Sequence, residues 1–202
     1  VIQGRYGLIN RQGEWVAEPR WEDLRYLYED GRMVAVKQGE FWAVLDRDGK
    51  VLVPPSLPSS PEVNSDYDPR YYVCKDESEK PLHHYNLAWQ AFDWPKDCQV
   101  ADSYNPTPQI LIQQGEGKSA RYGLLSDQGS VLLAVDYEQL TYHEGFGLFI
   151  AKQNRKFGLY SGADAWLLPC EYDNIKHPKD DYYLDDRLLA TICIVRQGKR
   201  YG

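Results

Sequence analysis

One short pattern recurs along the chain and constrains the fold more than any other feature. Each copy opens with an aromatic residue, a small residue and then Leu or Val, at Tyr6, Trp42, Tyr122 and Phe157. The first two openings lie 36 residues apart and the last two 35, and Tyr201 opens a further copy. This period is typical of arrays in which each unit buries its apolar side against its neighbours.

Each copy begins with the pattern of a tight β-hairpin. Residues 10–13, 46–49 and 126–129 start with Asn, Asp or Ser and end with Gly. This composition favours a type I turn, in which the leading side chain binds main-chain N–H groups and Gly13, Gly49 or Gly129 takes a positive φ. Short apolar segments flank each turn, so the sequence predicts two antiparallel strands per copy.

The second strand of each hairpin is expected to end at proline. Pro19, Pro54 and Pro169 follow these strands, and proline removes a main-chain donor from a sheet. An aromatic–acidic pair comes next in three copies: Trp21-Glu22, Tyr137-Glu138 and Tyr172-Asp173. We interpret the opening aromatic residues, Tyr201 included, as core, and expect the polar tips of the closing Trp21, Tyr137 and Tyr172 to reach the surface.

These patterns predict an all-β fold, because no long segment has a sustained helical period. We expect a repeat array of antiparallel β-hairpin units with one irregular insertion. The predicted boundaries are two repeats at residues 1–55, the insertion at 56–116, and two repeats plus the start of a fifth at 117–202. An open solenoid and a closed, propeller-like ring both fit this arrangement.

The repeats resemble the WG-repeat family, whose units open Gly-Lys-Trp-Gly-Leu-Ile-Asp and close Pro-x-Tyr-Asp-x-Ile. The matching openings are residues 4–10, 41–46, 121–125 and 156–160, and the matching ends are residues 19–24 and 169–175. The Trp is kept only at Trp42, where Ala43 replaces Gly. The resemblance implies a β-rich array, solenoid or propeller-like, that mediates interactions in a bacterial protein. It implies no catalytic residues.

Residues 56–116 break the pattern. Pro and Ser open the segment and many aromatic residues follow, a composition that argues against disorder. Residues 82–92, which stop before Pro95, are the most helix-like part of the chain. The segment is either a structured insertion or a degenerate repeat with an enlarged loop. Its candidate ligand-binding or partner-binding rings are Tyr71, Tyr72, Tyr85, Trp89 and Trp94.

Charge and hydropathy exclude several kinds of partner. The chain has 30 acidic and 23 basic residues and a net charge of −7, so we expect no nucleic-acid partner. No apolar run is long enough to span a membrane. The sequence shows no signal peptide, which favours a cytoplasmic location over a periplasmic or secreted one. An acidic cluster is a candidate docking patch for a basic partner: Asp180, Asp181, Asp185 and Asp186.

The sequence contains no recognisable catalytic or metal motif. The adjacent His83 and His84 would point apart on a strand or helix, and their spacing from Cys74 or Cys98 fits no zinc finger. We therefore expect no metal, no cofactor and no catalytic residues. The four cysteines favour isolated thiols, with a Cys74–Cys98 disulfide as the alternative.

Three functions follow from these observations. The first is a module for protein–protein interaction or scaffolding, because repeat arrays offer long surfaces without a reactive pocket. The second is a module that binds a glycan or another small ligand through the aromatic rings of residues 56–116. The third is an accessory or sensor domain of a larger enzyme.

Overall fold

The computed structural model describes residues 4–64, 70–101, 105–163, 165–176, 194–198 and 200–201. The chain divides into two compact units, residues 1–94 (unit 1) and residues 95–202 (unit 2). Each unit is described by itself. The division falls inside the segment predicted as an insertion, which therefore contributes to both units.

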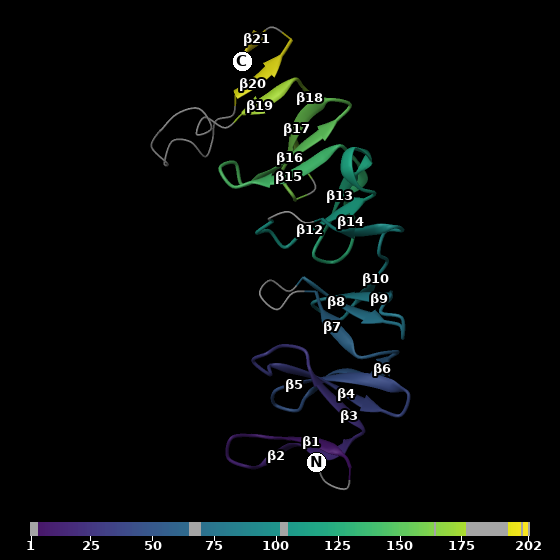
Figure 1. Cartoon of the computed structure of the whole chain (residues 1–202). Coiled ribbons are helices and arrows are strands. Elements are labelled where there is room, and N and C mark those ends of the chain that lie inside the picture. The colour runs from purple at the N-terminus through teal and green to yellow at the C-terminus, as the bar shows by residue number, and fades with distance from the viewer. Residues whose placement is uncertain are drawn as a thin grey trace. The chain divides into compact units, whose positions relative to one another are not determined.

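Unit 1 contains three antiparallel sheets that follow one another along the chain (Figure 1). The first has two strands, β1 (Tyr6–Ile9) and β2 (Trp15–Trp21). The second has four, β3 (Asp23–Tyr26), β4 (Met33–Gln38), β5 (Phe41–Asp46) and β6 (Val51–Leu57). The third also has four, β7 (Pro61–Val63), β8 (Tyr71–Lys75), β9 (Pro81–Asn86) and β10 (Ala91–Phe92).

Unit 2 repeats the same four-stranded arrangement. Its first sheet consists of β11 (Cys98–Val100), β12 (Ile110–Gln114), β13 (Arg121–Leu125) and β14 (Val131–Tyr137), with the 3-10 turn η1 (Gly117–Ser119) between β12 and β13. The second sheet is β15 (Gln139–His143), β16 (Leu148–Gln153), β17 (Lys156–Tyr160) and β18 (Trp166–Tyr172). Strands β19 (Asn174–Lys176), β20 (Ile194–Gln197) and β21 (Arg200–Tyr201) form a third. The predicted all-β repeat array is confirmed.

The predicted hairpin turns are confirmed in detail. Asn10 Oδ1 accepts the N–H groups of Gln12 at 3.0 Å and Glu14 at 2.9 Å, and Asp46 and Ser126 bind their turns in the same way. The fourth residue of each turn has a positive φ, +83° at Gly13 and +82° at Gly129. Each turn sets the register of the two strands that it joins.

Proline does not end the second strand, contrary to the prediction. Tyr6 pairs with Trp21 and Leu8 with Ala17, so three residues of β2, Pro19 among them, lie opposite a single residue, Gly7. In the hairpins that contain β6, β14 and β18, three residues of the second strand likewise lie opposite a single residue of the first. A bulge takes the proline out of the ladder of hydrogen bonds and lets the strand continue to the closing aromatic residue.

The glycine after the opening aromatic residue is explained by this bulge. A β-carbon at Gly158 would lie 2.6 Å from the carbonyl oxygen of Leu168 and 2.8 Å from the carbonyl carbon of Pro169. Gly123 and Gly7 face equally close main-chain atoms. The bulged strand thus approaches its partner more closely than a side chain allows, and only the copy with Ala43 departs from this rule.

The segment predicted as irregular contains a complete four-stranded sheet, β7 to β10. The helix expected at residues 82–92 is wrong, because β9, a turn and β10 occupy these residues. Asn86 Oδ1 accepts the N–H groups of Ala88 and Gln90, and Asp76 binds Ser78 and Lys80 likewise. The turns are those of the other sheets, but Glu79 (φ +61°) and Trp89 (φ +62°) stand at the position that glycine holds at Gly13, Gly49 and Gly129.

Neighbouring sheets within a unit share their apolar cores. Val34 and Val36 of β4 lie in the core beside β1 and β2, whereas Ala35 faces the core beside β7 to β10. In unit 2, Leu124 of β13 and Phe149 of β16 belong to one cluster. Sheets covered on both faces explain why the central strands are short, continuous apolar runs.

The recurring aromatic residues differ in burial. Trp42 is 6% exposed, as the core interpretation predicts, but Tyr6 is 36% exposed because no described strand covers the second edge of β1. Trp21 is 1% exposed with its indole Nε1 buried, so its polar tip does not reach the surface. The half-buried members are Tyr122, Tyr137, Phe157 and Tyr172. The side chain of Tyr201 is outside the described residues.

Candidate functional site

A first group of aromatic rings lies between the sheet β3–β6 and the sheet β7–β10. The ring of Trp89 stacks on that of Tyr72 with 3.9 Å between centroids and 1° between planes. Tyr28 meets Tyr72 edge-on, and their hydroxyl groups form a 2.9 Å hydrogen bond. Burial, followed by this hydrogen bond, raises the pKa of Tyr72 far above its ordinary value. Tyr72 is 1% exposed, so its ring serves as core.

A second group lies on the other face of the sheet β7–β10. The imidazole of His84 stacks on Trp94 at 4.5 Å and lies 5.7 Å from Tyr71 and 5.9 Å from Phe92. Burial among these rings, with a smaller effect of the neighbouring His83, lowers the pKa of His84 to about 4. A buried imidazole of this kind is neutral at physiological pH.

The five candidate binding rings are therefore divided between two packed groups. Tyr72, Tyr85 and Trp89 belong to the first, and Tyr71 and Trp94 to the second. Tyr71 and Tyr72 are buried, and the other three are half-buried. The structure does not bring all five together on one surface.

An acidic residue follows the closing aromatic residue at three junctions between sheets, and these junction acids are Glu22, Glu138 and Asp173. Asp173 accepts hydrogen bonds from Lys156 Nζ at 2.5 Å and from the N–H of Gly198 at 2.6 Å. These contacts lower the pKa of Asp173. Arg5 binds Glu22 at 2.8 Å and is the main cause of its lowered pKa. The N–H of Arg155 donates to Glu138 at 3.2 Å. At Glu138 and Asp173, the acidic position of the pattern thus ties a junction to the turn of the following sheet.

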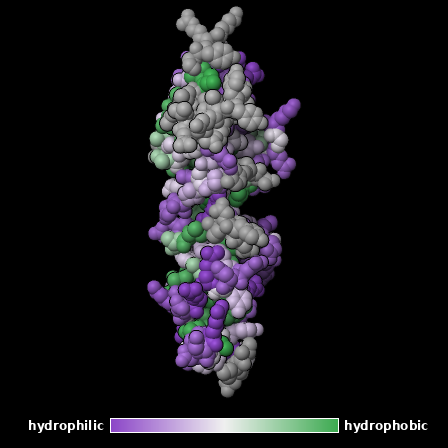
Figure 2. All heavy atoms as spheres, turned by 90° about the vertical axis from the view of Figure 1, so that its left-hand side faces the viewer, coloured by the Kyte–Doolittle hydropathy of each residue, from purple (hydrophilic) through white to green (hydrophobic). Residues whose placement is uncertain are grey.

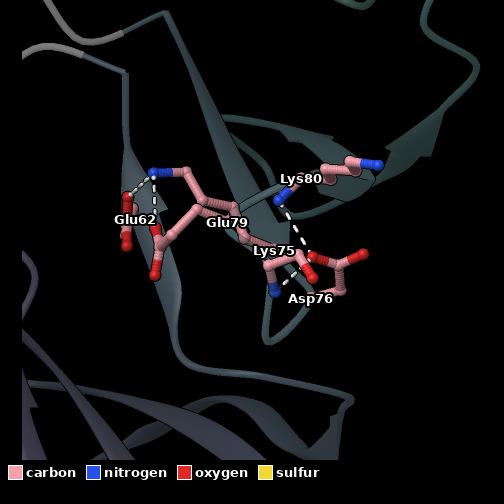
Figure 3. Close-up of polar contacts among 6 residues, drawn as sticks. Glu62, Lys75, Asp76, Glu79 and Lys80 are labelled. Carbon is pink, nitrogen blue, oxygen red and sulfur yellow. Dashed lines mark hydrogen bonds and ion pairs between the residues drawn. The ribbon is translucent and has the colours of Figure 1, made fainter.

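A group of charged side chains lies on the surface of the sheet β7–β10. Lys75 lies between two carboxylates, 2.5 Å from Glu62 and 3.4 Å from Glu79 (Figure 3). The hydrogen bond with Glu62, more than any other contact, raises the pKa of Lys75. All three side chains face solvent and neutralise one another in part, so this group offers little binding energy to a partner.

An exposed apolar residue recurs at the second position after the hairpin turn, and we call the residues at this position the turn-flanking row. Its exposed fractions are 42% at Trp15, 42% at Val51, 60% at Val131 and 38% at Trp166. Each residue occupies the same place in its own sheet, at the start of the last strand. On the face that Figure 2 shows, hydrophobic residues are scattered in small patches among hydrophilic ones.

Unit 2 contains a hollow of about 200 Å³ beside the ring of Tyr122. Ala101, Gln113 and Tyr122 of one sheet line it, with residues 138–141 at the start of the next. The lining combines an aromatic ring, amide and hydroxyl groups and the carboxylate of Glu138. No sequence motif marks this hollow, because Ala101 and Gln113 belong to neither the opening nor the closing motif of the repeat.

The remaining predicted features are placed as follows. Asp180, Asp181, Asp185 and Asp186 lie outside the described residues. Cys74, Cys98 and Cys170 are free thiols, so the alternative Cys74–Cys98 disulfide is not formed. Among the described residues, His, Cys, Asp and Glu side chains form no cluster of three suited to a metal ion. The described part of the chain also has no helix with the length and apolar character to cross a bilayer.

Comparison with known proteins agrees with this architecture. The family model of the WG containing repeat matches residues 6–41. The matched segment comprises the hairpin β1–β2 and the first two strands of the next sheet, so one sequence repeat contributes to two sheets. No curated protein and no solved structure matches the chain. Residues 6–41 are therefore similar to the WG containing repeat, in agreement with the resemblance seen in the sequence.

Proposed function

We propose that this β-repeat array is a non-catalytic module that binds another protein. The turn-flanking row carries this proposal. Single exposed apolar residues are normal on soluble proteins, but here they recur at one position of successive sheets. Trp15 and Val51 belong to neighbouring sheets of unit 1, and Val131 and Trp166 to neighbouring sheets of unit 2. Repetition of this kind is how stacked units build an extended binding surface.

A protein partner is favoured over a glycan by the chemistry of the exposed groups. Sugar recognition would need free aromatic faces, and the Trp89 ring already stacks on Tyr72. The row itself includes the aliphatic Val51 and Val131, which suit an apolar protein surface. The predicted acidic patch at Asp180, Asp181, Asp185 and Asp186 remains a second candidate contact for such a partner.

The environment of the nucleophilic groups supports a non-catalytic role. Burial raises the pKa of the thiols of Cys74, Cys98 and Cys170, which keeps them protonated and weakly nucleophilic. His84 is enclosed by the aromatic rings of Tyr71, Phe92 and Trp94 and is only 8% exposed, so its imidazole has little access to a substrate.

The experiment is capture of partners from extract of the source cells by the immobilised chain, with chemical crosslinking and mass spectrometry. A variant carrying Val51→Lys and Val131→Lys is compared with a control carrying Leu87→Lys and Val100→Lys. The control changes two exposed apolar residues outside the row and adds the same charge. We expect the row variant to lose the captured protein and the control to keep it. Equal capture by both, or no specific protein with the unmodified chain, would overturn the proposal.

A further inference from the structure

The hollow beside Tyr122 occupies a place that side chains of the protein fill in two other sheets. Cross-strand pairing makes Tyr122 the counterpart of Trp42 and Phe157, since each pairs with the second-from-last residue of the preceding strand. These partners are Gln113 for Tyr122, Lys37 for Trp42 and Lys152 for Phe157. The same pairing makes Ala101, opposite Leu111, the counterpart of Arg25, opposite Ala35. The sheets can therefore be compared position by position.

A cation covers the aromatic ring in both other sheets. The guanidinium of Arg25 lies 5.1 Å from the Trp42 ring, and the ammonium group of Lys152 lies 5.4 Å from the Phe157 ring. At Tyr122 the corresponding positions hold Ala101 and Gln113, whose side chains are neutral and shorter than those of Arg25 and Lys152. The described residues place no cation over the Tyr122 ring, and the hollow is lined by Tyr122 together with Ala101 and Gln113.

We infer that the hollow beside Tyr122 binds an arginine side chain of the protein partner. The inference rests on the proposed function only in assigning the arginine to a protein partner. The ring offers a face for a cation–π contact, and Glu138 offers a carboxylate. The Glu138 carboxylate accepts the N–H of Arg155 at 3.2 Å and forms an ion pair with Lys152, whose Nζ lies 3.8 Å away. Because a carboxylate has about four lone-pair sites, it can accept further N–H groups.

Arginine fits this lining better than a neutral ligand does. Its planar guanidinium carries several donors, and the hollow presents acceptors on Gln113, Glu138, Gln139 and Thr141. Gln113 also donates to the carbonyl of Gly115 at 2.8 Å, which leaves its amide oxygen as the free group. The protein's own Arg25 shows that this fold accommodates a guanidinium over the opening aromatic residue.

The test titrates the full chain with the peptide acetyl-Gly-Arg-Gly-amide and with its citrulline counterpart, which has the same shape without the charge. Amide chemical shifts of Tyr122 and Thr141 report binding. Ala101→Arg supplies the missing internal guanidinium and is expected to abolish the shifts. Val100→Arg adds the same charge on the neighbouring, exposed residue and is expected to leave them unchanged. The citrulline peptide should bind at least about fivefold more weakly.

Equal binding of the two peptides, or shifts that persist in folded Ala101→Arg, would overturn the inference. If Ala101→Arg fails to fold, Thr141→Arg fills the hollow from its other wall and decides the question in the same way. A chain that captures its protein partner but does not bind the arginine peptide refutes the inference and leaves the proposed function standing. Arginine-specific binding without any captured partner refutes the proposed function alone.

Discussion

Gly49 lies directly against the main-chain carbonyl of Val16, so a turn of the sheet β3–β6 contacts strand β2 of the preceding sheet without room for a β-carbon. The residue also has φ +78°. Two requirements therefore act on one glycine. The turn needs a left-handed conformation, and the stacking of two sheets needs a residue without a side chain.

Gly13 allows these two requirements to be separated. It has φ +83°, but a β-carbon there would meet nothing within 4 Å. We expect Gly13→Ala to lower the free energy of unfolding by about 1 kcal/mol, the cost of a left-handed non-glycine residue. Gly49→Ala should cost about 2 kcal/mol more, because β2 must move. Urea unfolding of both variants measures the difference, and equal costs would show that the close approach to Val16 is not maintained.

Trp89 and Glu79 provide a second matched pair, because both hold a turn position with positive φ that glycine holds elsewhere. Glu79→Gly should relieve the strained conformation and raise the free energy of unfolding by up to about 1 kcal/mol. Trp89→Gly relieves the same strain but removes the ring stacked on Tyr72. Loss of that packing costs about 3 kcal/mol, so we expect net destabilisation by about 2 kcal/mol. Thermal and urea unfolding would contradict this interpretation if both variants were stabilised.

The sequence predicts the repeated turns well because their chemistry is local. Asn10, Asp46 and Ser126 bind N–H groups only two and four residues away, so the pattern is visible in the sequence. The sheet β7–β10 escapes the same reasoning, because Glu79 and Trp89 replace the glycines that identify a turn. Asp76 and Asn86 lead those two turns, and they are the residues from which the turns could have been predicted.

Features that depend on pairing between strands are harder to predict. Proline at position 19 suggests the end of a strand when read alone. Only the register of Tyr6 with Trp21 and of Leu8 with Ala17 reveals the bulge that accommodates it. The hollow beside Tyr122 is likewise created by what Ala101 lacks relative to Arg25, and this comparison requires the alignment of sheets in space.

Asp173 is expected to stabilise the turn after β20. Its carboxylate accepts the N–H of Gly198 at 2.6 Å and is paired with Lys156. Asp173→Asn removes the charge and weakens both contacts, so amide hydrogen exchange at Gly198 should become several-fold faster. Glu171→Gln, two residues earlier and exposed, serves as the control and should leave that rate unchanged. Since its contacts lower the pKa of Asp173, its contribution is present at neutral pH and is lost as the pH falls below the ordinary range of Asp.

His84 makes unit 1 sensitive to mild acid. Its pKa is about 4 in the folded protein and about 6.5 in an unfolded chain. Between these values the unfolded chain binds a proton that the folded chain does not, so the free energy of unfolding falls as the pH drops from about 6.5 towards 4. The total loss is on the order of 3 kcal/mol, and above pH 7 this residue contributes no pH dependence.

Two substitutions on β9 test this sensitivity. His84→Phe keeps a ring in the group formed with Tyr71, Phe92 and Trp94 but cannot take up a proton. The difference in free energy of unfolding between pH 7 and pH 5, measured by urea unfolding, should therefore shrink in His84→Phe. His83→Gln, on the adjacent exposed residue, should retain most of that difference. An unchanged pH dependence in His84→Phe would mean that the imidazole is not buried in its neutral form, and the second aromatic group would then be more open to water than its ring contacts indicate.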